Sequence, residues 1–123
     1  MKRFEGKNVV VTGAAAGIGQ ATAQRIAEEG GNVAFIDINA EGLAATKQLV
    51  ESQGVKVWTY ECNVTDGEGV KKVIDQAAED MGGFDTLIHC AGILRTYHTH
   101  EMTFEQWHQI IDINLNGTFY FTR

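Results

Sequence analysis

The sequence predicts an α/β fold with a parallel sheet, because strand-like and helix-like segments alternate along the whole chain. The apolar run at 8–12 is continuous, whereas a strand with one solvent-exposed face would alternate apolar and polar residues. A continuous run is typical of a strand covered on both faces. The first three segments with helical spacing each end at glycine. Right-handed βαβ crossovers then give half of a doubly wound sheet, or a small complete one.

The first half of the chain contains two such strand and helix pairs. A valine-rich strand at 8–12 leads into a helix at 18–29, whose small apolar residues recur at helical spacing and which ends at Gly30 and Gly31. The stretch "NVAFIDI" is the second strand. A helix over about 40–52 follows, with Leu43, Lys47 and Val50 at near-helical spacing and Gly54 at its end.

The second half repeats the pattern. Alternation over 55–64 predicts a third strand, and Asp66 is the expected N-cap of a helix that reaches Met81. The stretch "FDTLIHCAG" is the fourth strand, and 93–100 is a loop. Thr103 and Gln106 form a capping-box pattern at the start of a last helical segment.

Composition excludes several classes of function. The chain has 123 residues and a formal net charge of −6, which argues against binding to nucleic acid or to an anionic membrane surface. No apolar leader or spanning segment is visible, so we expect a cytoplasmic protein. Cys62 and Cys90 form no C-x-x-C pair and are expected to be reduced thiols. We expect no metal site, and His98, His100 and Glu101 are interpreted as solvated loop residues.

A glycine-rich turn joins the first strand to the first helix. Gly13, Gly17 and Gly19 are spaced G-x-x-x-G-x-G, and such a turn lets backbone amides and the helix dipole approach a pyrophosphate. The alternative is that the glycines serve only close packing of the helix on the strand.

Asp37 ends the second strand, where a carboxylate can accept hydrogen bonds from an adenosine ribose. The same charge would repel a 2′-phosphate, and Ala16 and Ile38 stand where a basic residue would be needed to hold one. The sequence therefore favours NAD over NADP. The alternative for Asp37 is a solvated strand end.

Five features in a fixed order resemble the short-chain dehydrogenase/reductase family. They are "TGAAAGIG" at 12–19, Asp37, "NVTD" at 63–66, "HCAG" at 89–92 and "DINLNGTF" around Asn114. The resemblance covers the whole chain and the N-terminal half of the family's fold. It implies a Rossmann-like, doubly wound parallel sheet, incomplete, with about four strands and flanking helices. Residues 1–123 would form the NAD-binding domain.

The resemblance also implies roles for single residues. The glycine turn would wrap the pyrophosphate, and Asp37 would bind the adenosine ribose. The end of the third strand would lie along the adenine, and the end of the fourth strand would run past the cofactor. The implied cofactor-binding residues are Gly13, Gly17, Ile18, Gly19, Asp37, Ile38, Asn63, Val64, Cys90, Ala91 and Gly92. Asn114 matches the helix asparagine of the family's proton relay, the alternative being a polar residue on a helix face.

The chain departs from the family in two places. Asn63 stands where the family usually has Asp, so the contact with adenine is expected to change, since an amide donates as well as accepts. His89 and Cys90 replace the first two asparagines of the family's N-N-A-G. Those asparagines tie the central strands together, so the substitution weakens the resemblance for stabilisation of the sheet more than for contact with the cofactor, which is largely made by backbone.

The family moves a hydride between nicotinamide and a small alcohol or carbonyl substrate, using a serine and a Tyr-x-x-x-Lys pair. No tyrosine here has a lysine four residues later, and Ser52 is the single serine. The leading hypothesis is the cofactor-binding half of such an enzyme. The alternatives are a catalytically silent nucleotide-binding or subunit-interaction module, and a fragment too loose to bind. The apolar face of the last helix should be covered by the rest of a longer chain, by a second copy or by another subunit. The resemblance implies a homo-oligomer, because in the family this helix commonly packs in a subunit interface.

Overall fold

The computed structural model describes all residues 1–123, and its strands form one parallel sheet in the order β3-β2-β1-β4. Strand β1 (Asn8–Thr12) lies in the middle, between β2 (Asn32–Asp37) and β4 (Thr86–His89), and β3 (Val57–Glu61) forms the other edge. The register aligns Asp37 with Glu61 and Thr12 with His89, so the carboxyl ends of the four strands meet at one edge.

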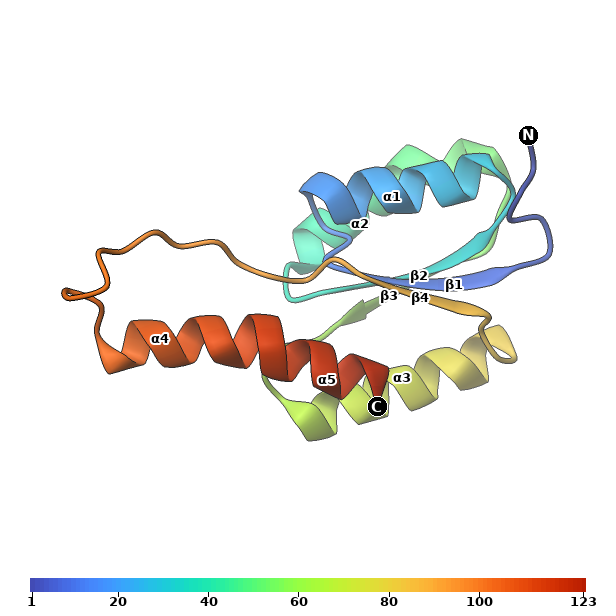
Figure 1. The fold of residues 1–123 in the computed structure, drawn as a ribbon. Coiled ribbons are helices and arrows are strands. Elements are labelled where there is room, and N and C mark those ends of the chain that lie inside the picture. Colours follow the sequence, from blue (N-terminus) through green and yellow to red (C-terminus); the bar gives the residue numbers. More distant parts are fainter.

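Helices cover both faces of the sheet (Figure 1). Helices α1 (Gly17–Glu28) and α2 (Ala40–Val50) lie on one face, and α2 runs on into a short 3₁₀ turn at Glu51–Gln53. Helix α3 (Gly67–Met81) lies on the other face beside α5 (Gly117–Thr122). The doubly wound α/β architecture expected from the sequence is confirmed.

Side chains of successive strand residues lie in two separate hydrophobic cores, because they point to opposite faces of the sheet in turn. Val9, Val11 and Phe35 pack with α1 and α2, whereas Val10 and Ile36 pack with α3 and α5. Both sets are fully buried. The unbroken apolar run of β1 is thus explained, because neither of its faces meets water.

Two helix starts follow the local signals in the sequence. The Asp66 side chain accepts from the Gly69 amide, and Thr103 and Gln106 make the reciprocal pair of a capping box. Both caps confirm the expected boundaries. The second helix is shorter than expected, since regular α-helix ends at Val50 and the 3₁₀ turn takes the next three residues.

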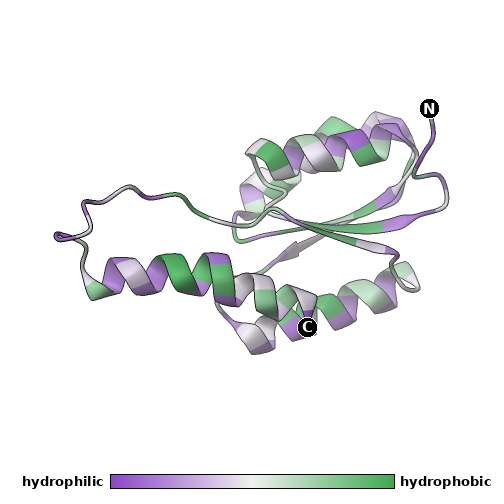
Figure 2. Ribbon diagram, viewed as in Figure 1, coloured by the Kyte–Doolittle hydropathy of each residue, from purple (hydrophilic) through white to green (hydrophobic).

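The last helical segment is not uniform. It begins as α4 (Phe104–Ile110), passes through a π-helical turn at Ile111–Asn116, and ends as α5. Figure 2 shows apolar residues gathered in the strands and in the middle of this segment. Trp107, Leu115 and Phe119 remain more than half exposed there. No helix is both long and apolar enough to cross a bilayer.

Candidate functional site

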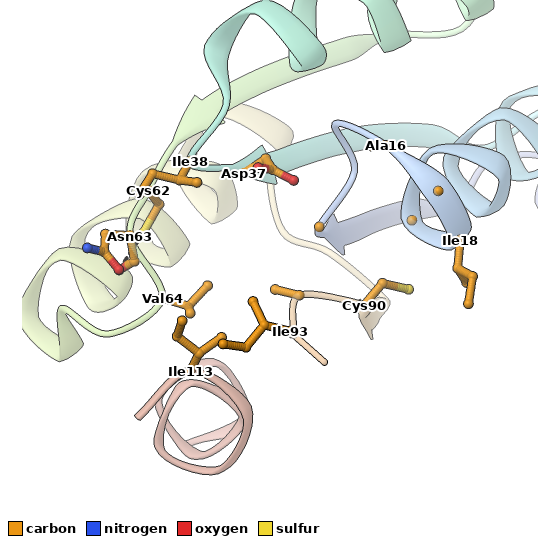
Figure 3. Close-up of a pocket in the computed structure, with 15 residues that line it drawn as sticks. Ala16, Ile18, Asp37, Ile38, Cys62, Asn63, Val64, Cys90, Ile93 and Ile113 are labelled. Atoms are coloured by element: carbon orange, nitrogen blue, oxygen red, sulfur yellow. Dashed lines mark hydrogen bonds between the residues drawn. The ribbon is translucent and has the colours of Figure 1, made fainter. Parts of the chain in front are cut away.

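A cleft of about 450 Å³ lies at the carboxyl ends of the strands. Ligands of open α/β sheets bind at this edge. Every cofactor-binding residue expected from the sequence lines the cleft, together with Ala16, Cys62, Ile93 and Ile113 (Figure 3). Their contact with a cofactor stays a prediction, but the structure brings these separate stretches of chain together.

The glycine turn forms one wall and can exist only without side chains at two positions. A Cβ on Gly13 would lie 2.8 Å from the Ala91 nitrogen and the Cys90 carbonyl carbon. A Cβ on Gly19 would overlap the Gly13 carbonyl oxygen and lie 2.5 Å from its carbon. Gly17 has open space around it but a φ of +56°, which favours glycine. The three glycines therefore serve close approach and turn geometry.

The start of α1 presents backbone amides to the cleft. The first helical hydrogen bond runs from the Gln20 amide to the Ala16 carbonyl, and no side chain caps the amides that precede it. No acidic residue stands in the first turn. Unpartnered amides and the positive end of the helix dipole suit a phosphate group, so this wall fits the pyrophosphate of a dinucleotide.

Asp37 lies at the end of β2, across from the start of α1 (Figure 3). Its Oδ2 accepts from the Ala15 amide at 3.1 Å and its Oδ1 accepts from the Asn39 amide at 3.0 Å. Each oxygen keeps a further lone pair for hydroxyl donors. Two backbone bonds thus hold the carboxylate in place, which is what a ribose-binding group needs.

The cleft contains no cationic side chain. None of the fifteen lining residues is lysine, arginine or histidine, and Ile38, beside Asp37, is largely exposed. An isolated phosphate monoester at this point would meet a carboxylate and an apolar side chain. The donor set therefore fits a ribose with free hydroxyls better than one with a 2′-phosphate.

The far wall of the cleft comes from the end of β3. Asn63 closes a turn with its own side chain, because its Oδ1 accepts from the amide and the hydroxyl of Thr65. Its Nδ2 makes no hydrogen bond within the chain and can donate to a ring nitrogen. Burial, and then the charge of Asp66, raise the pKa of the Cys62 thiol, which keeps this lining group neutral.

Asn114 does not line the cleft and instead holds one of its residues. Its Oδ1 accepts from the Ile93 amide and its Nδ2 donates to the Ile93 carbonyl, both at 2.8 Å. It sits in the π-helical turn, and a Cβ on Gly92 would lie 3.1 Å from its Oδ1. The side chain thus fastens the loop after β4 to the last helical segment. A role in proton transfer stays a prediction.

His89 carries a contact that the sequence did not suggest. The family's asparagine ties the central strands at this position, and here His89 Nδ1 lies 2.7 Å from Thr12 Oγ1 and links β4 to β1. The two residues are paired in the sheet register, which the sequence alone does not give. The loop histidines His98 and His100 lie apart from the cleft, and no group of three metal-ligating side chains occurs.

Parallel strand order, helices on both faces and a cleft at the strand ends define a Rossmann-like α/β protein. The family model for short chain dehydrogenases matches residues 7–123. The chain belongs to the short-chain dehydrogenase/reductase family, a family of dinucleotide-binding proteins.

Individual relatives agree with this assignment. The chain is 39% identical over 121 residues to a 3-oxoacyl-[acyl-carrier-protein] reductase of Thermotoga maritima, covering 98% of this chain and 49% of the relative. NAD⁺-bound xylitol dehydrogenase superposes with a TM-score of 0.95 at 35% identity, over 98% of this chain and 47% of that one. Carveol dehydrogenase from Mycobacterium avium in complex with NAD superposes with a TM-score of 0.93 at 30% identity, over 99% of this chain and 49% of that one. The chain spans about half the length of the relatives it matches.

Proposed function

We propose that residues 1–123 are the cofactor-binding half of an NAD-dependent oxidoreductase that acts on an alcohol or carbonyl substrate. The observation that carries the proposal is the anchored Asp37 carboxylate in a cleft without a cation. Two of the superposed relatives are NAD complexes, which supports the same cofactor. When bound, NAD supplies the hydride acceptor of the reaction.

Specificity for NAD follows from what the carboxylate does to each ribose. Asp37 accepts hydrogen bonds from the 2′- and 3′-hydroxyls of NAD, whereas a 2′-phosphate would place like charges in contact. Ile38 adds no compensating charge. We expect an affinity for NAD at least about tenfold above that for NADP, since one lost hydrogen bond to a charged group costs about 1.5–3 kcal/mol.

The chain's own part in the chemistry is to bind and orient. The amides at the start of α1 would hold the pyrophosphate and Asn63 and Val64 would flank the adenine, while Asn114 keeps Ile93 at the cleft. The serine and the Tyr-x-x-x-Lys pair that move the proton in this family do not occur among these 123 residues. Turnover by this stretch alone is therefore not expected.

The test is a calorimetric titration of the 123-residue chain with NAD and with NADP. Asp37→Ala should lose at least about tenfold in NAD affinity. Glu61→Ala is the matched control, because Glu61 pairs with Asp37 in the sheet register but does not line the cleft. Ile38→Arg should raise the affinity for NADP. Equal affinities for the two cofactors, or an Asp37→Ala variant that binds like wild type, would contradict the proposal.

A homo-oligomer is the assembly we propose, on the strength of the apolar face of α4 and α5. Phe104, Trp107, Leu115 and Phe119 are each exposed by more than half. Large apolar side chains grouped on one helical segment favour association over solvation. Sedimentation of wild type and of Trp107→Glu tests this, and a monomeric wild-type chain at high concentration would refute it.

A further inference from the structure

His89 stands where β4, β1 and α5 meet. Its Nδ1 lies 2.7 Å from Thr12 Oγ1 on β1, and its ring centroid lies 5.3 Å from that of Phe121 on α5. Its Nε2 is buried and has no hydrogen-bond partner. A titratable ring thus occupies a position at which a simple amide would make the same link without titrating.

The hydrogen bonds of Thr12 favour one protonation state of this ring. The Cys90 and Ala91 amides both donate to Thr12 Oγ1, at 3.1 and 3.2 Å, and the Cys90 amide also donates to the Thr12 carbonyl oxygen at 3.2 Å. A hydroxyl has one proton and two lone pairs, so with two amides on its oxygen the proton is directed at His89 Nδ1. This arrangement favours a neutral His89 with its own proton on Nε2. We call the three bonds of Thr12 Oγ1 the Thr12 latch.

The Thr12 latch holds one wall of the cleft. Cys90 and Ala91 line the cleft, and their backbones pack directly on Gly13, where an added Cβ would come within 2.8 Å of both. The latch therefore sets how closely the end of β4 approaches the glycine turn. A shift of this wall changes the space available to a bound dinucleotide.

We infer that His89 is a positioning residue that makes dinucleotide affinity depend on pH, because its protonation breaks the Thr12 latch and loosens the wall of the cleft at Ala91. A protonated ring directs an N–H at a hydroxyl oxygen whose two lone pairs are already filled. At least one of the three bonds must then be lost. The inference rests on the proposed function, in that the ligand is a dinucleotide.

The surroundings of His89 contain no group that would offset its charge. Its Nδ1 contacts Thr12 on β1 and its ring packs against the Phe121 ring on α5, and neither of these side chains titrates. Burial alone lowers the pKa of His89, with no charged neighbour contributing. Protonation in the folded chain therefore begins below the ordinary histidine range near about 6.5. Affinity should be complete above that range and fall as the pH drops through the lowered pKa.

The first experiment needs no ligand. Nitrogen NMR of the 123-residue chain reports the His89 tautomer, and amide exchange reports Cys90 and Ala91. We expect Nδ1 to be unprotonated at neutral pH, and the protection of the Ala91 amide to fall about tenfold as His89 titrates. The Cys90 amide should change less, because it also donates to the Thr12 carbonyl oxygen. A proton on Nδ1 at neutral pH, or protection that does not follow the His89 titration, would overturn the inference.

The second experiment measures NAD affinity at several pH values across the His89 titration. His89→Asn retains an oxygen that can accept from Thr12 but does not titrate, so the part of the pH dependence that follows the His89 titration should be absent from this variant. His108→Gln is the matched control on exposed α4 and should keep the wild-type pH dependence. A His89→Asn variant with the wild-type pH dependence would overturn the inference.

The two proposals fail in different ways. Absence of saturable NAD binding in every variant would contradict the proposed function, and the exchange of the Cys90 and Ala91 amides would still decide whether the Thr12 latch responds to His89. Normal NAD binding with no change across the His89 titration would leave the proposed function intact and overturn the role of His89.

Discussion

Replacing Gly19 with alanine is the sharpest test of the glycine turn, because the structure gives both the cause and the size of the effect. A Cβ there would meet backbone atoms of Gly13 and lie 2.5 Å from its carbonyl carbon, which is about 0.9 Å inside the 3.4 Å limit of ordinary contact. The atoms that the Cβ would meet are all backbone atoms of Gly13 and Ala14, so no side-chain rotation can relieve the contact. Overpacking of this kind costs about 1–3 kcal/mol or more. We place Gly19→Ala at the upper end, about 3 kcal/mol.

Nucleotide binding should fall as well, because separation of Gly19 from Gly13 displaces the amides at the start of α1. We expect at least a tenfold weaker affinity for NAD, from the loss of about one hydrogen bond to a charged group. Urea unfolding and calorimetric titration measure the two effects.

Gly54→Ala is the matched control for this variant. Gly54 has a φ of +71° and nothing within 4 Å, and it lies outside the cleft. Its alanine variant should therefore lose only about 1–2 kcal/mol, from backbone strain, and bind NAD normally. A Gly19→Ala chain that is as stable as Gly54→Ala and binds like wild type would refute the reasoning.

Two predictions concern the stability of the fold. Glu29 is held by Arg3, with 2.6 Å between Nη2 and Oε1, and by Arg25; the hydrogen bond from Arg3 is the largest cause that lowers the pKa of Glu29, to about 2. The lowered pKa stabilises the folded chain fully above the ordinary glutamate pKa of about 4.3, and this stabilisation is lost as the pH falls toward 2. In Glu29→Gln, the free energy of unfolding in urea should therefore fall less steeply at acid pH than in wild type. The exposed control Glu51→Gln should keep the wild-type dependence. An unchanged dependence at acid pH in Glu29→Gln would contradict this assignment. Phe35 is fully buried in β2, and Phe35→Ala should lose about 3–5 kcal/mol in thermal or urea unfolding, against about 0.5 kcal/mol or less for exposed Phe104→Ala. Equal losses for the two phenylalanines would show that the core is not where the structure places it.

Features fixed by neighbouring residues could be predicted from the sequence. Asp66 and Thr103 cap their helices by accepting hydrogen bonds from amides three residues later in the chain. The glycine turn comes directly after its strand in the sequence. The parallel sheet and its strand ends followed from the alternation of elements. Gathering of the cleft residues followed too, because carboxyl ends of parallel strands share one edge.

Features that depend on distant residues could not be predicted in this way. The π-helical turn has no local signal, since Asn114 is held by Ile93, which lies 21 residues earlier in the chain. The same holds for His89, whose Nδ1 is paired with the Thr12 hydroxyl, 77 residues away. A pattern within one segment contains no information about such partners, and the register of the sheet was needed to bring them together.

The departures of this chain from its family become intelligible once the atoms that face the cleft are known. Cys90 and Ala91 hold their wall through backbone amides that donate to Thr12, so the side chain at 90 can change without breaking the latch. Asp37 and Gly19 have no such freedom, because one supplies the only carboxylate of the cleft and the other admits no side chain. His89 lies between these cases. It retains the link to Thr12 that an amide oxygen could also make, and adds a proton-binding site to the wall of the cofactor cleft.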